Sequence, residues 1–212
     1  MPSLLKCTLC AADTEKFYNF RNRDYHRCLN CHALLMDPQF YLSPAAEKER
    51  YDQHNNDPAD PGYRRFVSPL VDRIKALYSR DADGLDFGAG SGPVVSTMLK
   101  EAGYRPVLYD PFYWNDPGLL NERYDFIACC EVIEHFHRPF DDFKRLQSLL
   151  NPGGSIFCMT ETYAETTDFE SWHYKNDPTH VFFYHQDSLA WIRDNIGFSS
   201  LEISGRLIVF HL

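Results

Sequence analysis

Long hydrophobic runs are missing from this sequence. No segment approaches the roughly 18 consecutive apolar residues that a membrane-spanning helix requires. The opening stretch, MPSLLKCTLC, contains too short an apolar run for a secretory signal peptide. These absences predict a cytoplasmic protein that has no membrane partner.

An excess of positive charge is missing as well. The chain has 21 Lys and Arg residues against 30 Asp and Glu residues, which gives a formal net charge of −9. Nucleic acids and anionic membranes bind clusters of Lys and Arg, so this charge argues against both partners. The 44% of hydrophobic and 15% of aromatic residues instead favour a packed globular protein. A length of 212 residues suits one α/β domain with a small accessory module.

Seven cysteines are present, and four of them form two C-x-x-C pairs separated by 17 residues. Two such turns can present four thiolates in the tetrahedron that structural zinc accepts. A reducing cytosol opposes a disulfide framework, and a thioredoxin-like motif would need a single C-x-x-C in a βαβ unit. We therefore expect a zinc ribbon in residues 1–42 and a structural zinc bound by Cys7, Cys10, Cys28 and Cys31. The neighbouring His26 and His32 are expected at the surface.

The rest of the chain divides at about residue 80. Residues 43–80 predict two helices, joined by the turn sequence NDPADPG, that form a linker and capping segment. Residues 81–212 alternate between strand and helix patterns, starting with LDFGAGSG and PVVSTMLKEAG. Such alternation predicts an α/β fold in which a mostly parallel sheet carries helices on both faces.

A glycine loop joins the first strand and helix of this α/β region. Gly88, Gly90 and Gly92 follow a buried-type strand, and Asp110 ends the next strand. Glycines allow a close approach of a ligand, and the acidic strand end can accept the ribose hydroxyls of an adenosine cofactor. The spacing G-x-G-x-G, followed by Pro93, departs from the dinucleotide fingerprint G-x-G-x-x-G. This difference disfavours an NAD-dependent oxidoreductase.

The segments LDFGAGSG, LYD, YDFIACCEVIEH and LLNPGGSIF resemble the successive motifs of class I S-adenosylmethionine-dependent methyltransferases. The resemblance covers about residues 50–212 and is closest to the subgroup that includes ubiquinone-biosynthesis O-methyltransferases. It implies a Rossmann-like sheet of seven strands whose last strand is antiparallel. Only 13 residues separate Asp110 from Tyr124, so we expect the third strand to be short or missing.

The same resemblance implies an S-adenosylmethionine site at the strand ends. It places the loop beside the methionine part of the cofactor, Asp110 at the ribose and Cys130 near the sulfonium. Asp86 would either orient the loop or merely cap a turn, and Phe112 would join a neighbour in flanking the adenine. The residues assigned to the cofactor are Asp86, Gly88, Ala89, Gly90, Asp110, Pro111 and Cys130. The N-terminal residues that would cap the cofactor are Tyr51, His54, Tyr63, Arg64 and Arg65.

The stretch CCEVIEHFHRP gathers carboxylates and imidazoles at the end of a central strand. Glu131, Glu134 and His135 would share one face if they formed a helical turn. The resemblance adds His180, from the segment THVFFYH, as a fourth group. The four side chains could hold a divalent cation that binds the acceptor, a role for which oxygen and nitrogen ligands are suited. Alternatively, a histidine is a general base, or the stretch is only a junction between strand and helix.

The function that the resemblance implies is transfer of a methyl group from S-adenosylmethionine to an oxygen, nitrogen or carbon of a small-molecule acceptor. The chain does not reveal the acceptor. An alternative is a binding protein, in which the zinc ribbon contacts a protein partner and the cofactor domain is not catalytic. The cleft histidines favour catalysis, because a scaffold would not need them.

Overall fold

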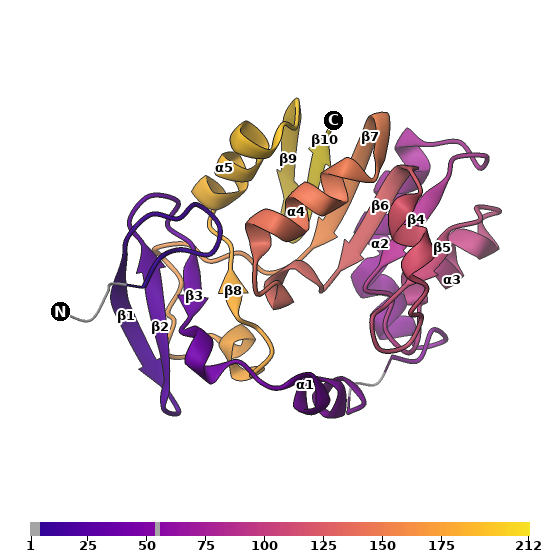
Figure 1. Ribbon diagram of the computed structural model, residues 1–212. Coiled ribbons are helices and arrows are strands. Elements are labelled where there is room, and N and C mark those ends of the chain that lie inside the picture. Colours follow the sequence, from indigo (N-terminus) through magenta and orange to yellow (C-terminus); the bar gives the residue numbers. More distant parts are fainter. Residues whose placement is uncertain (1–4, 54–55) are drawn as a thin grey trace.

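Two β-sheets organise the chain in the computed structural model, which describes residues 5–53 and 56–212 (Figure 1). The smaller sheet is antiparallel and lies toward the N-terminus, in strand order β1-β2-β3-β8. Its strands are β1 (Thr14–Phe20), β2 (Arg23–Cys28), β3 (Leu34–Met36) and β8 (Phe182–Phe183). The last strand comes from near the C-terminus, so the ribbon completes its sheet with a distant part of the chain.

The larger sheet is mostly parallel and has the order β5-β4-β6-β7-β10-β9. Its strands are β4 (Gly84–Phe87), β5 (Val107–Tyr109), β6 (Tyr124–Cys130), β7 (Leu150–Met159), β9 (Ser200–Ser204) and β10 (Leu207–His211). Strand β10 is antiparallel to both β7 and β9, as the resemblance implies. The described residues form six strands in place of seven, because the 13 residues after Asp110 hold only a β-bridge and the 3-10 turn Pro117–Asn121.

Alternating residues of the central strands divide the core between the two faces of the larger sheet. On β6, Phe126 and Ala128 pack against α2 (Pro61–Leu77) and α3 (Val94–Glu101). Ile127 and Cys129 point to the opposite face, which α4 (Pro139–Ser148) and α5 (Gln186–Ile196) cover. This period of two is typical of a strand buried on both sides, and it confirms the predicted α/β layers.

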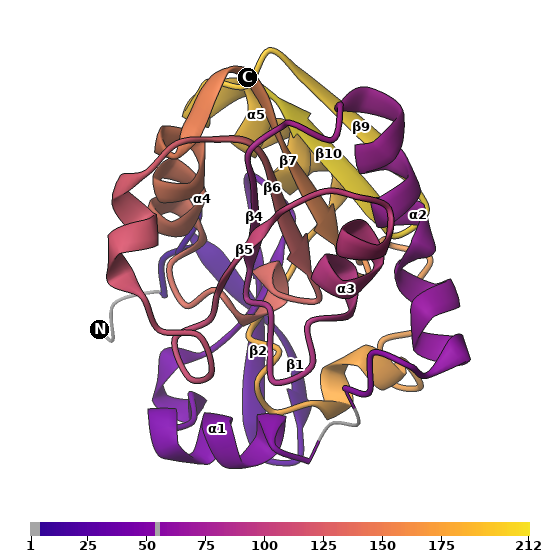
Figure 2. The ribbon, with the colours of Figure 1, turned by 90° about the vertical axis from the view of Figure 1, so that its right-hand side faces the viewer.

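The remaining helix, α1 (Pro44–Tyr51), does not cover the sheet. It begins after Ser43, whose hydroxyl accepts a hydrogen bond from the amide of Ala46. Both views place α1 at the end of the molecule toward which β6 and β7 run (Figure 2). In open α/β sheets this end binds the ligand. None of the helices within the described residues is long and apolar enough to cross a membrane.

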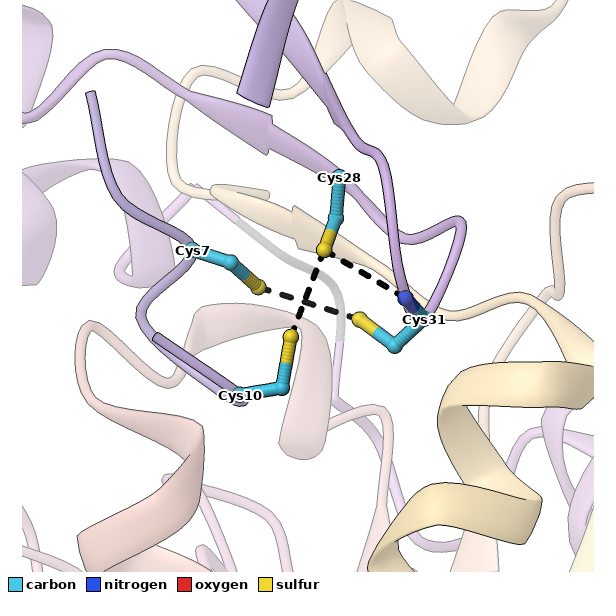
Figure 3. A group of neighbouring side chains, drawn as sticks. All are labelled: Cys7, Cys10, Cys28 and Cys31. Atoms are coloured by element: carbon cyan, nitrogen blue, oxygen red, sulfur yellow. Dashed lines mark hydrogen bonds between the residues drawn. The ribbon is translucent and has the colours of Figure 1, made fainter. Parts of the chain in front are cut away.

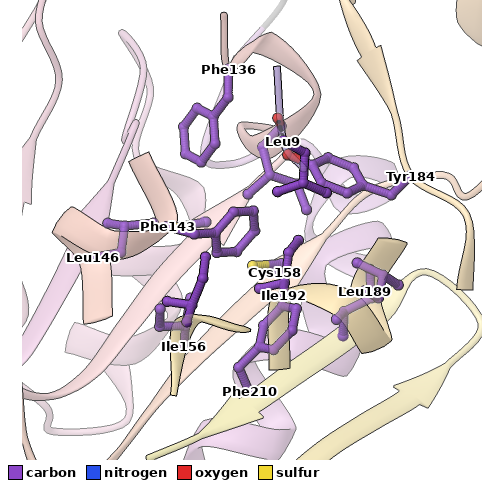
Figure 4. Packing of buried hydrophobic residues seen from close by; sticks show 14 of the residues in the cluster. Leu9, Phe136, Phe143, Leu146, Ile156, Cys158, Tyr184, Leu189, Ile192 and Phe210 are labelled. Carbon is purple, nitrogen blue, oxygen red and sulfur yellow. Dashed lines mark hydrogen bonds between the residues drawn. The ribbon is translucent and has the colours of Figure 1, made fainter. Parts of the chain in front are cut away.

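The ribbon packs directly into the core of the larger domain. Leu9 and Leu35 belong to the same buried cluster as Phe136, Phe143 and Tyr184 (Figure 4). All five side chains are at most 8% exposed. The two sheets are therefore joined by shared apolar packing as well as by the pairing of β3 with β8.

Candidate functional site

Four cysteines converge at one end of the ribbon (Figure 3). The Sγ atoms of Cys7 and Cys31 lie 3.8 Å apart, and those of Cys10 and Cys28 lie 3.3 Å apart. All four are free thiols, and their sulfurs lie within 4.8 Å of one another. Zinc bonds of about 2.3 Å place the sulfurs of a regular tetrahedron about 3.8 Å apart. The donor set and its spacing therefore fit a zinc ion.

Each C-x-x-C pair ends in the same backbone conformation. Ala11 follows Cys10 with φ 58°, and His32 follows Cys31 with φ 58°. This left-handed conformation is uncommon for residues other than glycine, and here it turns the chain back beneath the sulfurs. The amides of Asn30 and Cys31 both point at Cys28 Sγ, at 3.4 Å. The two turns thus form matching halves of one site.

The glycine loop follows β4, and its backbone requires glycine. Gly88 and Gly90 have φ of +75° and +63°, in the left-handed region. A Cβ on Gly88 would lie 2.5 Å from Cγ2 of Val132, so a side chain there would clash. Ala89 and Gly88 both donate backbone hydrogen bonds to the carbonyl of Tyr109, the last residue of β5. These contacts hold the loop against the carboxyl ends of β4 and β5.

Asp86 lies below this loop and is 3% exposed. Its Oδ2 accepts a hydrogen bond of 3.1 Å from the amide of Ser96 in α3. Burial raises the pKa of this carboxyl group to about 6. Asp86 therefore joins the strand before the loop to the helix after it, which agrees with a role in orienting the loop.

Asp110 holds the loop from the end of β5. Its Oδ2 accepts the amide of Gly90 at 3.0 Å, and its Oδ1 accepts the amides of Phe112 and Tyr113 at 2.8 and 3.1 Å. A carboxylate oxygen can accept two hydrogen bonds, so Oδ2 keeps capacity for one more donor, such as a ribose hydroxyl. The carboxylate is thus fixed by the backbone around the place where the resemblance puts the ribose.

Trp114 is a loop contact that the sequence reasoning missed. Its indole Nε1 donates a hydrogen bond of 2.8 Å to the carbonyl of Gly90, and its backbone pairs with Asp110. The short segment after Asp110 therefore turns back over the loop in place of a third strand. The shortness of that segment was the available signal, since its residues had to remain near the strand end.

The capping segment also contacts the glycine loop. A Cβ on Gly92 would lie 1.6 Å from the carbonyl oxygen of Asn56, which shows how closely this segment approaches. The ring of Tyr51 lies 5.8 Å from Phe112 and 5.3 Å from His135, centroid to centroid. Tyr51 therefore touches both the proposed adenine side and the histidine cluster.

The other predicted capping residues differ in their surroundings. Tyr63 is half-buried at the start of α2, and burial raises the pKa of its phenol. Arg64 forms an ion pair with Glu101 of α3, and Arg65 is exposed. His54 lies outside the described residues. Of this set, Tyr51 lies against the candidate site most directly.

Glu131 directly follows β6 and has a left-handed conformation, with φ 53°. The helical turn that would align Glu131 with Glu134 is not formed, because the chain turns at this residue and continues as the 3-10 turn Ile133–His135. Both carboxylate oxygens of Glu131 instead accept hydrogen bonds from Nη2 of Arg206, at 2.9 and 2.8 Å. The adjacent Cys130 is at the strand end, and burial raises the pKa of its thiol.

Glu134, His135 and His180 do converge. The ligand atoms of the three side chains lie within 4.8 Å of one another, and the two imidazole rings are 4.9 Å apart. Glu134 is fully buried, and its Oε1 accepts a hydrogen bond from the hydroxyl of Tyr174. Its Oε2 is buried and has no hydrogen-bond partner among the described residues. Burial raises the pKa of Glu134 to about 7, and burial together with the nearby Glu134 raises the pKa of Glu131 to about 7.

The backbone sets the tautomers of the two histidines. Nδ1 of His135 lies 2.9 Å from the carbonyl of Thr179, and Nδ1 of His180 lies 2.7 Å from the carbonyl of Tyr174. A carbonyl only accepts hydrogen bonds, so both Nδ1 atoms carry a proton, and in the neutral ring the lone pair is then on Nε2. This is the usual arrangement of a metal-binding histidine. Burial also lowers the pKa of His135, which favours its neutral form.

Arg206 is a second residue that the sequence reasoning missed. It lies in the turn between β9 and β10, and it pairs with Glu161 as well as with Glu131. Its guanidinium also lies 5.2 Å from the ring centre of Tyr174. Arg206 therefore holds Glu131 to one side of the cluster. No motif marked it, because its importance depends on β10 running antiparallel beside β7.

Comparison with known proteins agrees with this geometry. The sequence model of one protein family, described as a methyltransferase domain, matches residues 53–203. The chain belongs to this methyltransferase family. The match begins in the capping segment and includes the glycine loop, Asp110 and the Glu134 cluster, and it ends just before Arg206. It confirms the family that the motifs predict.

Among curated proteins, the methyltransferase resembles ubiquinone biosynthesis O-methyltransferases. It is 28% identical to the enzyme from Histophilus somni over 81 residues, which are 36% of this chain and 34% of that protein. It is 25% identical to the enzyme from Actinobacillus pleuropneumoniae over 95 residues, which are 43% of this chain and 41% of that protein. The chain thus matches less than half the length of these relatives.

Solved structures show the same fold at low sequence identity. The 1,6-didemethyltoxoflavin-N1-methyltransferase of Burkholderia thailandensis has a TM-score of 0.51 and 15% identity, over 93% of this chain and 98% of that one. An O-methyltransferase family protein from the same organism has a TM-score of 0.50 and 14% identity, over 70% and 56% of the two chains. These likenesses establish the methyltransferase fold.

Proposed function

We propose that this chain transfers a methyl group from S-adenosylmethionine to a small-molecule acceptor bound beside Glu134, His135 and His180. The observation that carries the proposal is the convergence of two imidazoles and a buried carboxylate next to the loop that Asp110 holds, with Nδ1 of each imidazole donating to a backbone carbonyl. The similar Burkholderia thailandensis methyltransferase was solved with bound S-adenosylhomocysteine, which supports this cofactor class.

The loop and its supports would bind the cofactor. Asp110 would accept a ribose hydroxyl through the remaining capacity of Oδ2, while Phe112 and Tyr51 would cover the adenine side. The cofactor supplies an activated methyl group, so the protein mainly positions the two reactants. Cys130, at the end of β6, would lie near the sulfonium.

Glu134, His135 and His180 would hold a divalent cation that orients the acceptor. The orphan Oε2 of Glu134 supports this assignment, since a buried carboxylate oxygen without a partner is costly. A cation there would act as a Lewis acid on the acceptor. Glu131 lies next to the three ligands, but it forms an ion pair with Arg206. It would therefore influence the charge of the site without binding the cation. The four ribbon cysteines would hold a separate, structural zinc.

Binding and turnover test the cofactor assignment. S-adenosylmethionine with a labelled methyl group is incubated with the zinc-loaded protein and a metabolite extract, and labelled products are followed by mass spectrometry. We expect a labelled small molecule from the wild type. In Asp110→Ala the loop and the ribose lose a charged acceptor, so calorimetry should show at least about a tenfold loss of cofactor affinity.

Asp116→Ala is the matched control, because Asp116 caps only the neighbouring 3-10 turn through the amide of Gly118. Its cofactor affinity should stay within about twofold of the wild type. Equal affinities of the Asp110→Ala and wild-type proteins would remove Asp110 from the site. Tight cofactor binding without any labelled product, across extracts and added divalent cations, would favour the non-catalytic binding protein.

A further inference from the structure

The backbone of one residue, Val181, connects the ribbon to the histidine cluster. The amide of Val181 donates a hydrogen bond of 2.9 Å to the carbonyl of Glu134, and its own carbonyl accepts one of 2.8 Å from the amide of Met36. Met36 ends β3, the strand that follows the second cysteine pair. Residue 181 therefore bridges the metal-binding module and the turn that carries the buried carboxylate.

The same short segment orients both histidines. His180 directly precedes Val181, and the carbonyl of Thr179 fixes the tautomer of His135. Asp177 supports this segment, because its Oδ1 accepts hydrogen bonds from the amide and hydroxyl of Thr179 at 3.0 and 2.6 Å. Immediately after it, β8 pairs with β3. The position of His135 and His180 thus depends on β3, because the segment that orients them continues into β8, which pairs with β3.

Packing strengthens this connection. Cys28, Cys31 and Leu35 share a buried cluster with Phe136, which directly follows His135, and with Tyr184, which lies four residues after His180. Figure 4 shows Phe136 and Tyr184 in this cluster. The hydroxyl of Tyr184 also donates to the carbonyl of Ile133, at 3.0 Å. By contrast, the glycine loop is held by Asp110, Trp114 and the capping segment. The capping segment contacts both sides of the site, because Tyr51 also lies against His135, whereas the ribbon contacts given above reach the acceptor side.

We propose that the metal-loaded ribbon is the positioning element of the acceptor site, and that Met36 and Val181 transmit its position to Glu134, His135 and His180. A module of this size depends on its metal for folding, so loss of zinc would release β3. Release of β3 removes the partner of Val181 and of β8. The inference rests on the proposed function only in assigning the histidines to the acceptor.

The test compares Cys10→Ser with Cys10→His in the full-length protein, because histidine still ligates zinc whereas serine does not. Cys10 is the most exposed of the four ligands, so the larger imidazole has space there. The readout is the pair of hydrogen-bonded Nδ1–H signals of His135 and His180 in spectra of ¹⁵N-histidine-labelled protein. Each signal is assigned from its loss in the corresponding His→Gln variant.

We expect Cys10→Ser to lose zinc and both ring signals, while its affinity for S-adenosylmethionine stays within about threefold of the wild type. Cys10→His should keep zinc, both signals and the same cofactor affinity. Should Cys10→Ser fail to fold, zinc is removed from the wild type with a chelator and titrated back. Both signals should then return in proportion to bound zinc.

Unchanged ring signals in zinc-free protein would overturn the inference. Loss of cofactor binding together with the signals would also overturn it, because the ribbon would then support the whole domain and not one side of the site. A zinc-loaded protein with both signals but without methyl transfer would refute the proposed function alone.

Discussion

Two clusters in this molecule have the same composition, two histidines and one glutamate, but opposite hydrogen-bonding arrangements. In the first, Nδ1 of His135 and Nδ1 of His180 each donate to a backbone carbonyl, and Nε2 of His180 lies 4.0 Å from Oε1 of Glu134. In the second, formed by His32, Glu165 and His185, the ligand atoms also lie within 4.8 Å of one another. Distance and composition alone therefore do not distinguish the clusters.

The tautomer of His185 distinguishes the second cluster from the first. Its Nδ1 accepts a hydrogen bond from the amide of Asp187 at 3.1 Å, where it caps the start of α5. Its Nε2 must then carry the proton, which it donates to Glu165 Oε2 at 3.1 Å. His32 is paired with Asp187 Oδ2 at 2.7 Å. This second cluster is already satisfied as a helix cap with ion pairs, and it offers a metal no lone pair on His185.

Burial of the carboxylates differs in the same direction. The side chain of Glu165 is 65% exposed, whereas that of Glu134 is fully buried and has an oxygen without a partner. Water can solvate the first carboxylate, but the second requires a proton or a cation. A metal site is thus recognised by ligand atoms that lack hydrogen-bond partners, as well as by the types of ligand that are present.

The largest expected effect comes from replacing each cluster in turn. Glu134→Gln combined with His180→Ala should reduce methyl transfer at least about 100-fold, because it removes two of three cation ligands. Glu165→Gln combined with His32→Ala should leave the rate within about twofold. Cobalt or manganese binding, measured in zinc-loaded protein, should be lost only in the first variant. Equal rates in the two variants would abolish the distinction between the clusters.

A buried carboxylate outside both clusters separates the effect of burial from that of ligation. The pKa of Asp86 is raised to about 6 in the folded protein, so folding binds a proton between about pH 4 and pH 6. Stability due to this group is therefore present at low pH and is lost as the pH rises through 6. A shift of this size corresponds to about 2–3 kcal/mol.

Asp86→Asn removes this titration while keeping a side chain of similar shape. Between pH 4 and pH 7 the free energy of unfolding of the wild type should fall relative to that of Asp86→Asn by about 2–3 kcal/mol. Urea unfolding of both proteins in the same buffers measures the difference, and it cancels the acid release of zinc that both share. Parallel curves would show that Asp86 is ionised throughout this range.

The smallest effect tests whether the second cluster is a cap. His185→Ala should lower the free energy of unfolding by about 1 kcal/mol more than His185→Asn, because asparagine retains an acceptor for the amide of Asp187. Thermal and urea unfolding provide the measurement, and methyl transfer at 25 °C should be equal in the two variants. If asparagine gives no recovery, the cap does not account for the position of His185.

The strands and helices of the larger domain were predictable because their patterns are local. Alternation on β6 and β7, the glycine loop and the short interval after Asp110 all lie within a few residues of what they determine. The four cysteines were predictable for the same reason, since each pair forms one turn. Local spacing therefore located the glycine loop and the four-cysteine cluster.

Contacts between distant segments were not predictable in this way. Arg206 reaches Glu131 only because the last strand is antiparallel, and β8 consists of two residues that carry no strand pattern of their own. The left-handed conformation of Glu131 also prevents the helical turn that was expected there. The spacing of three and four residues between the side chains does not reveal this backbone conformation. Tertiary structure decides such details, including the tautomers that distinguish the two clusters.

The pairing of β3 with β8 has a consequence for how the protein folds. During synthesis the two cysteine pairs emerge well before β8, the strand that completes their sheet. Contacts between segments so far apart in the sequence carry a large loop-closure entropy and form slowly. The ribbon would therefore acquire its metal first and gain its final strand only after most of the larger sheet has been synthesised. Its exposed edge is, until then, a place where the nascent chain can pair wrongly.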